Sequence, residues 1–525
     1  MSSGRIAQSD SDGPRMVAAG ALTRSATRAN IALIAAFLAV EVLAVTAFQA
    51  PNQTLVRFAA LDSGGELAIG DLIRRGFRPG VDFGYPYGLL PLLVGRLWYG
   101  LAGLSPGSFN VEVTACVVLS SWGLARLAAY RRVGVAGLVL IALAIPDLIF
   151  VTYLTSAHAI EQALLIHALA EQARGRRSTA LALLTACCFV KPSLAFVQGL
   201  AVVVAILAAG RRAGRAATAR SIVPPLATAA VLAAVLAASF GPSSLARTLS
   251  PATGAAIYRA SNYGFFRGTG REFWVLPGGG LRDYFRYEVG FWLLGTALLS
   301  WAGLVGARRL ARGVATAEGE RDEEIVVTCA AVHLAFVALL FGHRLTWVYS
   351  LPMLVAGLAT LANRGPRHAL AAWVLAALLL VSDRSKAVDI LRHRKADSPS
   401  PAMHGLWSSP GELREWERAL ELTRGRRPAL LATCEGATVL FPGLAPPVGG
   451  YLIAGNMRPV EADRKADQLA GASMIISAHP PDWDGFRRWP RIAAAFDGCE
   501  LIFEGRSLRV YRRRPAAPAS PRVRP

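Results

Sequence analysis

The residues best suited to chemistry gather in one stretch, "LDSGGELAIGDLIRRGFRPGVDFGYPYG", at residues 61–88. This stretch follows the first apolar segment and carries four carboxylates. Asp62 and Glu66 are four positions apart, so they would share one face of a helix. The alternative is an amphipathic helix at a membrane surface, with its acids in water and Asp62 as a possible N-cap.

Several cations occur where an anionic ligand would explain them. Lys191, in "FVKPSL", interrupts an apolar hairpin, which usually marks a partner or a bound anion, although the side chain could also snorkel to the interface. Arg344, in "FGHRLTW", is either a phosphate clamp or an anchor to lipid headgroups. The 241–288 loop contains Arg259 and Arg271, which fit a phosphate or diphosphate headgroup unless the loop is simply solvated.

A histidine and a carboxylate stand one helical turn apart in "TSAHAIEQ", at the end of another apolar segment. They are His158 and Glu161, and the alternative role for His158 is packing or capping. The sequence has no P-loop, no G-x-S-x-G, no HExxH and no Cys/His cluster with zinc spacing, so we expect no metal site.

The composition predicts a polytopic α-helical membrane protein. Of the 525 residues, 53% are hydrophobic and only 17% are charged, too few to coat a soluble core of this size. The apolar runs predict about eleven transmembrane helices. The net charge of +21 comes from arginines in short loops between these runs, as the positive-inside rule predicts. No basic stripe alternates with aromatic residues, so the expected partner is the lipid bilayer and not nucleic acid.

The arginines also predict the topology. All five clusters fall on one side of the membrane if residues 88–104 lie along the outer interface and do not cross it. The apolar run 178–210 would cross twice, with a break at Pro192 and Lys191 at the outer turn. The clusters are Arg131/Arg132, Arg174/Arg176/Arg177, Arg211/Arg212/Arg215, Arg308/Arg309/Arg312 and Arg364/Arg367.

Composition also divides the chain into domains. Past residue 400, helix-like "SPGELREWERALELTRG" precedes strand-like "PALLATC", "ASMIISA", "CELIFEG" and "SLRVYRR", which predicts a small extracytoplasmic α/β domain. Cys434 and Cys499 could pair there if the domain faces an oxidising compartment. The predicted parts are a disordered cytoplasmic tail at 1–28, a membrane domain at 29–383 with outer loops at 49–109 and 241–288, the α/β domain at 400–512, and a disordered basic tail at 513–525.

The first outer loop resembles that of the GT-C type membrane glycosyltransferases, in the protein mannosyltransferase branch that includes the lipid A aminoarabinose transferase. The "FVKPS" turn is similar to the lysine-containing hairpin of that family, and "GHRLTWVYSLP" resembles its late Arg/Tyr/Pro motif. In the loop, the matching residues are Gly76, Pro79, Asp82, Phe83, Tyr85, Pro86, Tyr87 and Gly88.

This resemblance implies a GT-C-like membrane domain that transfers a sugar from a polyprenyl-phosphate donor to a glycan, lipid or protein acceptor, on the outer face of the bacterial inner membrane. The N-terminus would be cytoplasmic. Asp62 matches the position of the family's base, and Lys191 and Arg344 would stabilise the leaving phosphate, with Arg259 and Arg271 in reserve. In this chain Ser63 follows Asp62, and the next acid is Glu66.

The resemblance also implies a set of substrate-binding residues. It implies no cofactor, because the lipid-linked sugar is itself a substrate. These candidates are Asp82, Tyr85, Tyr87, His158 and Glu161. A lipid-linked sugar flippase that uses Asp147, His158, Glu161 and Lys191 as a polar path is the alternative, and a non-catalytic scaffold is another.

Overall fold

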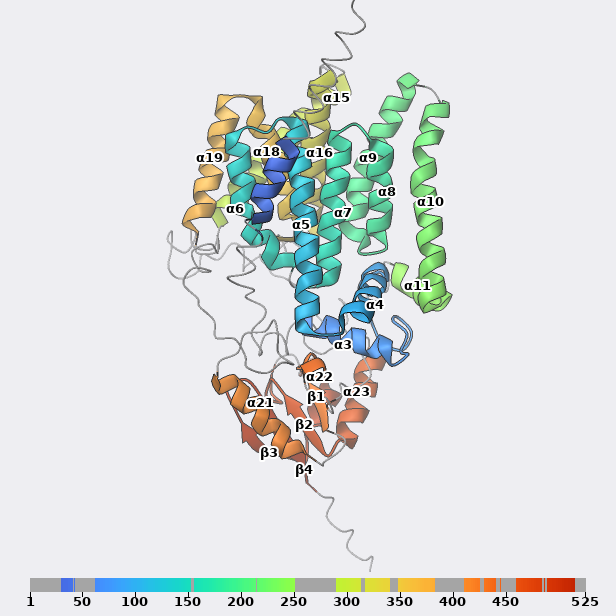
Figure 1. Ribbon diagram of the computed structural model, residues 1–525, viewed down its shortest axis with the longest axis vertical. Helices are drawn as coiled ribbons and strands as arrows, with labels where there is room; N and C mark the ends of the chain where they lie inside the picture. Colours follow the sequence, from blue (N-terminus) through green and yellow to red (C-terminus); the bar gives the residue numbers. More distant parts are fainter. Residues whose placement is uncertain are drawn as a thin grey trace, which may run out of the picture.

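The computed structural model describes residues 30–40, 42, 62–152, 155–213, 215–250, 289–312, 317–339, 348–382, 410–424, 429–440, 444, 459–483, 486 and 489–514. A helical bundle forms one end of the molecule and a small α/β domain the other (Figure 1). Two short helices, α3 (Asp62–Arg74) and α4 (Leu90–Ala102), lie between them.

The bundle is built from apolar helices that run roughly along the long axis of the molecule (Figure 1). By length and composition, three of the described helical segments could cross a membrane: Pro106–Arg131, Thr218–Phe240 and Val289–Arg312. The other apolar helices among the described residues are shorter, so the count of about eleven crossings stays a prediction. The helices of the bundle are α5 (Pro106–Arg131), α6 (Val135–Thr152), α7 (Ser156–Ala173), α8 (Arg177–Cys188), α9 (Pro192–Ala213), α10 (Arg215–Phe240), α15 (Val289–Arg312), α16 (Ala317–Leu339), α18 (Leu351–Leu361) and α19 (Pro366–Val381), with the short helices α11 (Pro242–Leu249), η1 (Val348–Ser350) and η2 (Ala362–Arg364) at their ends.

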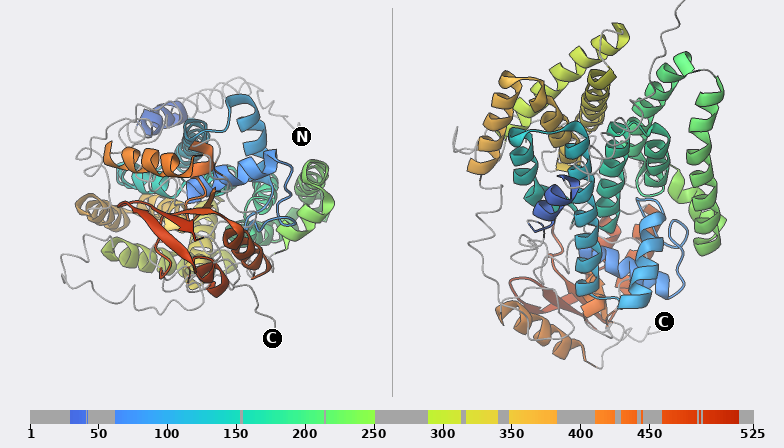
Figure 2. Two further views of the ribbon diagram at one scale, coloured as in Figure 1. Left: turned by 90° about the horizontal axis from the view of Figure 1, so that it is seen from below. Right: turned by 45° about the horizontal axis from the view of Figure 1, so that its top comes forward.

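One helix is far less buried than its neighbours. Only 11% of the most apolar window of α10 is buried, and this helix stands at the edge of the bundle in both views of Figure 2. It packs mainly against α8, α9 and α11, and it contains Pro224 and Pro225.

Acidic residues near the start of α16 form ion pairs with arginines from four separate helix ends. Carboxylates are favourable in the first turns of a helix, where the dipole is positive. The pairs are Arg131 Nε with Asp322 Oδ1 at 2.6 Å, Arg309 Nη1 with Glu323 Oε1 at 3.1 Å, Arg364 Nη2 with Glu323 Oε2 at 2.7 Å, and Arg177 with Glu324. These four arginine clusters therefore lie at one end of the bundle, which we call the arginine end.

The fifth cluster joins the same end through the backbone. The Ser178 hydroxyl, at the start of α8, donates to the carbonyl of Ser221 near the start of α10, at 2.9 Å. The start of α10, which directly follows the end of α9 with Arg211 and Arg212, therefore lies beside the start of α8.

At the opposite end, the first loop docks on the turn between α8 and α9. The Gly88 amide donates to the Val190 carbonyl at 2.8 Å, and the Leu90 amide donates to the Phe189 carbonyl at 3.1 Å. A Cβ atom on Gly88 would lie 2.0 Å from the Phe189 oxygen, so only glycine allows this approach. Past this contact α4 lies across the end of the bundle, where Arg96 Nη1 donates to the Ser239 carbonyl of α10 at 3.0 Å.

The α/β domain contains one four-stranded sheet in the order β1-β2-β4-β3. β1 and β2 pair in parallel, with Ala429 opposite Met474, whereas β2–β4 and β4–β3 are antiparallel. Cys434 and Cys499 are both free. The elements are α21 (Pro410–Thr423), β1 (Ala429–Ala432), α22 (Ala437–Leu440), α23 (Pro459–Gly471), β2 (Met474–Ser477), α25 (Pro490–Ala494), β3 (Cys499–Glu504) and β4 (Arg509–Arg513).

This domain packs on the first loop and α3. Helix α22 contacts α3, and Arg464 Nη1 donates to the Asp82 carbonyl at 3.0 Å. The buried carboxylate of Glu461 sits so close to Gly84 that a Cβ atom there would lie 2.5 Å from its oxygen. The loop is thus held from both sides, by the bundle and by the α/β domain.

Gly88→Ala tests the backbone contact. We expect a destabilisation of about 1 to 3 kcal/mol, because the added methyl forces the loop away from Phe189. The measurement is the thermal unfolding midpoint of the protein in detergent. Gly100→Ala in α4 is the control, since a Cβ atom there meets nothing within 4 Å and alanine favours the helix. Equal midpoints for the two variants would contradict the contact.

Candidate functional site

A lysine held among aromatic rings lies at the end of the bundle opposite the arginine end. Lys191 precedes Pro192, which begins α9. Its ammonium nitrogen is 3.7 Å from Glu161 Oε2, 4.9 Å from the centre of the Tyr349 ring and 5.8 Å from that of Tyr87. The Lys191 side chain is 17% exposed, whereas Glu161 is fully buried. The ammonium is thus positioned by cation–π contacts and a buried carboxylate while it keeps access to a ligand.

His158 connects this carboxylate to the first loop. Thr155 caps α7 by accepting the His158 amide at 3.1 Å, which places the imidazole in the first turn. Nδ1 of the ring is 3.5 Å from Glu161 Oε2, and Nε2 is 3.4 Å from the Tyr87 hydroxyl. Among the described residues, no hydrogen-bond donor reaches either oxygen of Glu161, so the cation that compensates its charge is the Lys191 ammonium.

Tyr349 completes the group, which we call the lysine cluster: Tyr87, His158, Glu161, Lys191 and Tyr349. The Gln162 amide of α7 donates to the Tyr349 carbonyl at 2.8 Å, and the Tyr349 ring lies 4.3 Å from the His158 ring, centre to centre. The next residue, Ser350, shares a 2.8 Å hydrogen bond with the buried His333 of α16. The tyrosine is thereby fixed by helices on two sides.

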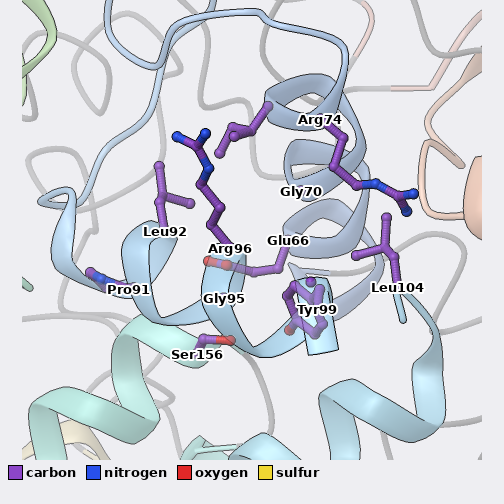
Figure 3. Close-up of a pocket in the computed structure, with 12 residues that line it drawn as sticks. Glu66, Gly70, Arg74, Pro91, Leu92, Gly95, Arg96, Tyr99, Leu104 and Ser156 are labelled. Atoms are coloured by element: carbon purple, nitrogen blue, oxygen red, sulfur yellow. The ribbon is translucent and has the colours of Figure 1, made fainter. Parts of the chain in front are cut away.

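Beside the lysine cluster, α3 and α4 enclose a cavity of about 150 Å³. Figure 3 shows Glu66 of α3 reaching into it, with Tyr99 and Ser156 at its base. Glu66 is 6% exposed, whereas Arg74 and Arg96, which also line the cavity, are exposed. A cavity of this volume accommodates a single six-membered ring. We call it the Glu66 cavity.

The base of this cavity is a short chain of hydrogen bonds. The Tyr99 hydroxyl donates to Glu112 Oε2 at 2.5 Å, and the Ser156 hydroxyl donates to the same oxygen at 3.2 Å. Burial, with the Glu112 charge beside it, raises the pKa of the Tyr99 phenol, which therefore keeps the proton that it donates. Ser156 and His158 both belong to the first turn of α7, so the cavity and the lysine cluster are neighbours.

The structure brings together most of the predicted residues. Glu66 lines the cavity, and Tyr87, His158, Glu161 and Lys191 form the lysine cluster, with Tyr85 buried against Tyr87 at 5.5 Å between ring centres. Asp62 begins α3, one turn before Glu66, and its side chain lies outside the described residues. Arg259, Arg271 and Arg344 also lie outside them.

Asp82 is not directed into either site. Its carboxylate accepts hydrogen bonds from the Arg78 amide at 2.7 Å and from Arg78 Nε at 3.3 Å. Slight burial raises the pKa of Asp82, but these bonds and the charges of Arg78 and Arg464 outweigh that effect and lower the pKa. In this geometry the side chain holds the turn, and its role in substrate binding stays a prediction.

Reasoning from the sequence does not single out four residues of the site, which are Tyr99, Glu112, Ser156 and Tyr349. Glu112 lies inside a long apolar helix, a position that usually marks function, and this signal could have revealed it. Tyr99 falls within the predicted interfacial stretch 88–104, and Ser156 and Tyr349 fall within the quoted motifs "TSAHAIEQ" and "GHRLTWVYSLP". Over the described ranges, no group of three or more His, Cys, Asp or Glu side chains is arranged to hold a metal ion.

Comparisons with known proteins find a likeness among solved structures. No protein-family model matches the chain, and no curated protein sequence matches it. Among solved structures, the chain is similar to the arabinofuranosyltransferase AftD from mycobacteria, with a TM-score of 0.44 and 15% sequence identity over 92% of this chain. It covers only 41% of AftD.

Removing one partner of the Lys191–Glu161 pair tests the lysine cluster. Lys191→Met leaves a buried carboxylate without its cation, and we expect a loss of about 3 kcal/mol or more in the free energy of unfolding. The double variant Lys191→Met/Glu161→Gln should recover much of this loss, because no charge remains buried. The measurement is unfolding in detergent.

The control for this experiment is Arg75→Met. Arg75 pairs with Asp71 at 2.6 Å, but its side chain is 46% exposed, so we expect a change of at most about 1 kcal/mol. A double variant as unstable as Lys191→Met alone would contradict the interpretation that Lys191 compensates the buried charge of Glu161.

Proposed function

We propose that this protein transfers a sugar from a lipid-linked phosphate donor to an acceptor, at the membrane face opposite the arginine end. One observation carries the proposal: a partly exposed ammonium and a cavity with a buried carboxylate lie side by side at the end of an apolar bundle. The two groups suit the two halves of a glycosyl transfer, which are departure of a phosphate and attack by a hydroxyl.

Lys191 binds the donor phosphate. As the bond between the anomeric carbon and the phosphate oxygen breaks, the electron pair stays on the phosphate, and the ammonium stabilises the added charge. Glu161 pairs with the lysine, His158 contacts that carboxylate, and the Tyr87 and Tyr349 rings flank the ammonium. A cation in such a setting interacts more strongly with phosphate than one in bulk water. Arg344 is a second candidate for the same phosphate.

The acceptor binds in the Glu66 cavity. A single sugar ring fits its volume, and the Glu66 carboxylate and the Ser156 hydroxyl offer hydrogen-bond partners to ring hydroxyls. Asp62, one turn earlier on α3, takes the proton of the attacking hydroxyl. Direct displacement inverts the anomeric configuration. The reaction needs no cofactor, since the lipid-linked sugar is a substrate.

The finer assignments belong to the same proposal. The lipid is a polyprenyl phosphate, the membrane is the bacterial inner membrane, and the N-terminus lies in the cytoplasm with the α/β domain outside. Because that domain packs on α3 through α22, it stands beside the acceptor cavity and forms part of the acceptor's surroundings.

The test is transfer of radiolabelled sugar from a panel of polyprenyl-phosphate donors in membranes that express the wild type or Asp62→Asn at matched levels. We expect Asp62→Asn to lower the transfer rate by about 100-fold or more, because the hydroxyl loses its base. Asp71→Asn is the matched control. It lies on the same helix, where its carboxylate pairs with the exposed Arg75, and it should keep the wild-type rate.

Equal rates in the wild type and Asp62→Asn would show that Asp62 has no role in the mechanism, and the proposal of transferase activity would still stand. If the wild type transfers sugar from no donor, the transferase is wrong, and the flippase is then tested by measuring donor movement across vesicles.

A further inference from the structure

His333 of α16 is a fully buried histidine that lies behind the lysine cluster. Both of its ring nitrogens are at hydrogen-bond distance from a hydroxyl. Nε2 is 2.8 Å from Thr296 Oγ1 of α15, and Nδ1 is 2.8 Å from Ser350 Oγ at the end of η1. A neutral imidazole has a single N–H, so it donates to one of these hydroxyls and accepts from the other. The ring therefore joins α15, α16 and η1.

The Ser350 hydroxyl makes this bond in place of the one that its position favours. Ser350 is the N-cap residue of α18, and a serine there usually accepts a hydrogen bond from an amide of the first turn. In the described part of the chain, its side chain makes no such bond with α18. The hydroxyl thus holds η1 against α16 and does not cap the helix that follows.

Tyr349, the residue before Ser350, carries this constraint to the lysine cluster. The centre of its ring is 4.9 Å from the Lys191 ammonium. The ring of Phe336, also on α16, meets the Tyr349 ring edge to face at 6.1 Å between centres. Helix α16 therefore contacts the tyrosine ring and also holds its neighbour in the chain. Since a cation–π contact depends on the distance from cation to ring, the place of this ring affects the place of the ammonium.

We propose that His333 is a positioning residue for the donor phosphate, which acts on Lys191 through Ser350 and Tyr349. Its hydrogen bond to Ser350 holds the Tyr349 ring beside the ammonium, and the ammonium then stands where the phosphate binds. The part of this inference that concerns the donor rests on the proposed transferase activity. The effect of His333 on the Lys191 ammonium does not.

Two substitutions of His333 separate its two hydrogen bonds. Asparagine places its amide near the position of Nδ1, and glutamine places its amide near that of Nε2. His333→Asn therefore keeps a partner for Ser350, and His333→Gln keeps one for Thr296. Ser350→Ala and Thr296→Val remove the same two bonds from the other side. If His333 only packs α15 against α16, the bond to Thr296 matters more, whereas a positioning role makes the bond to Ser350 the important one.

The first measurement detects the Lys191 ammonium without any activity. The chain has only four lysines, of which Lys465 is fully buried, so reductive methylation of the full-length protein with isotopically labelled formaldehyde gives few NMR signals. Methylation keeps the charge, and the Lys191 signal is identified by its loss in Lys191→Met. We expect Ser350→Ala and His333→Gln to shift this signal by more than its line width, because the nearby aromatic ring moves. His333→Asn and Thr296→Val should leave it in place.

The second measurement is the kinetics of sugar transfer with the donor that the wild type uses. Ser350→Ala and His333→Gln should raise the KM for the donor about fivefold, which is the effect of one hydrogen bond, and leave the KM for the acceptor unchanged. His333→Asn should restore most of the donor affinity.

An unmoved Lys191 signal in Ser350→Ala would overturn the proposal, and so would a larger shift in Thr296→Val than in Ser350→Ala. If the variants of His333 fail to fold, the comparison of Ser350→Ala with Thr296→Val decides. If the wild type transfers sugar from no donor while the signal shifts as expected, the transferase is wrong and the positioning of Lys191 by His333 stands.

Discussion

The candidate site depends on a backbone contact that only glycine permits. Where Gly88 meets Phe189 and Val190, two segments about a hundred positions apart in the sequence share a pair of backbone hydrogen bonds. This contact sets Tyr87 against Lys191 and positions α4, and therefore the wall of the Glu66 cavity. A side chain at position 88 would separate the carboxylate cavity from the ammonium beside it.

The rest of the architecture follows from the cost of charge in an apolar bundle. A buried ion needs a partner within a few ångströms, since the free-energy cost of its desolvation is otherwise greater than the free energy gained from packing. At one end Glu161 accompanies Lys191, and at the other the acids of α16 accompany arginines from four helix ends. The charges at both ends therefore hold helices together.

Features that arise from neighbours in sequence could be predicted. Pro192 indicated the break that leaves Lys191 at a turn, and the three-residue spacing of His158 and Glu161 indicated that they share a helix face. The four strand-like runs of the α/β domain contain the four observed strands.

Features that arise from the packing of distant segments could not be predicted. Nothing in the sequence pairs Tyr99 with Glu112, assigns the acids of α16 to particular arginines, or places β4 between β2 and β3. The contacts of Asp82 could not be predicted from the sequence either. Its place in a motif suggested a ligand, whereas its partners are a nearby arginine and a backbone turn.

The acidic start of α16 has a consequence for the order of events in biosynthesis. Arg131, Arg177 and Arg309 precede α16 in the chain, so the insertion machinery meets them before their carboxylate partners exist. While they are unpaired they act with full charge as topological signals. Once α16 is made, its acids neutralise them, so the charge that orients the nascent chain is greater than the charge that the mature protein presents to the membrane. The same arginines thus serve first as topological signals and later as partners in ion pairs that hold the helices together.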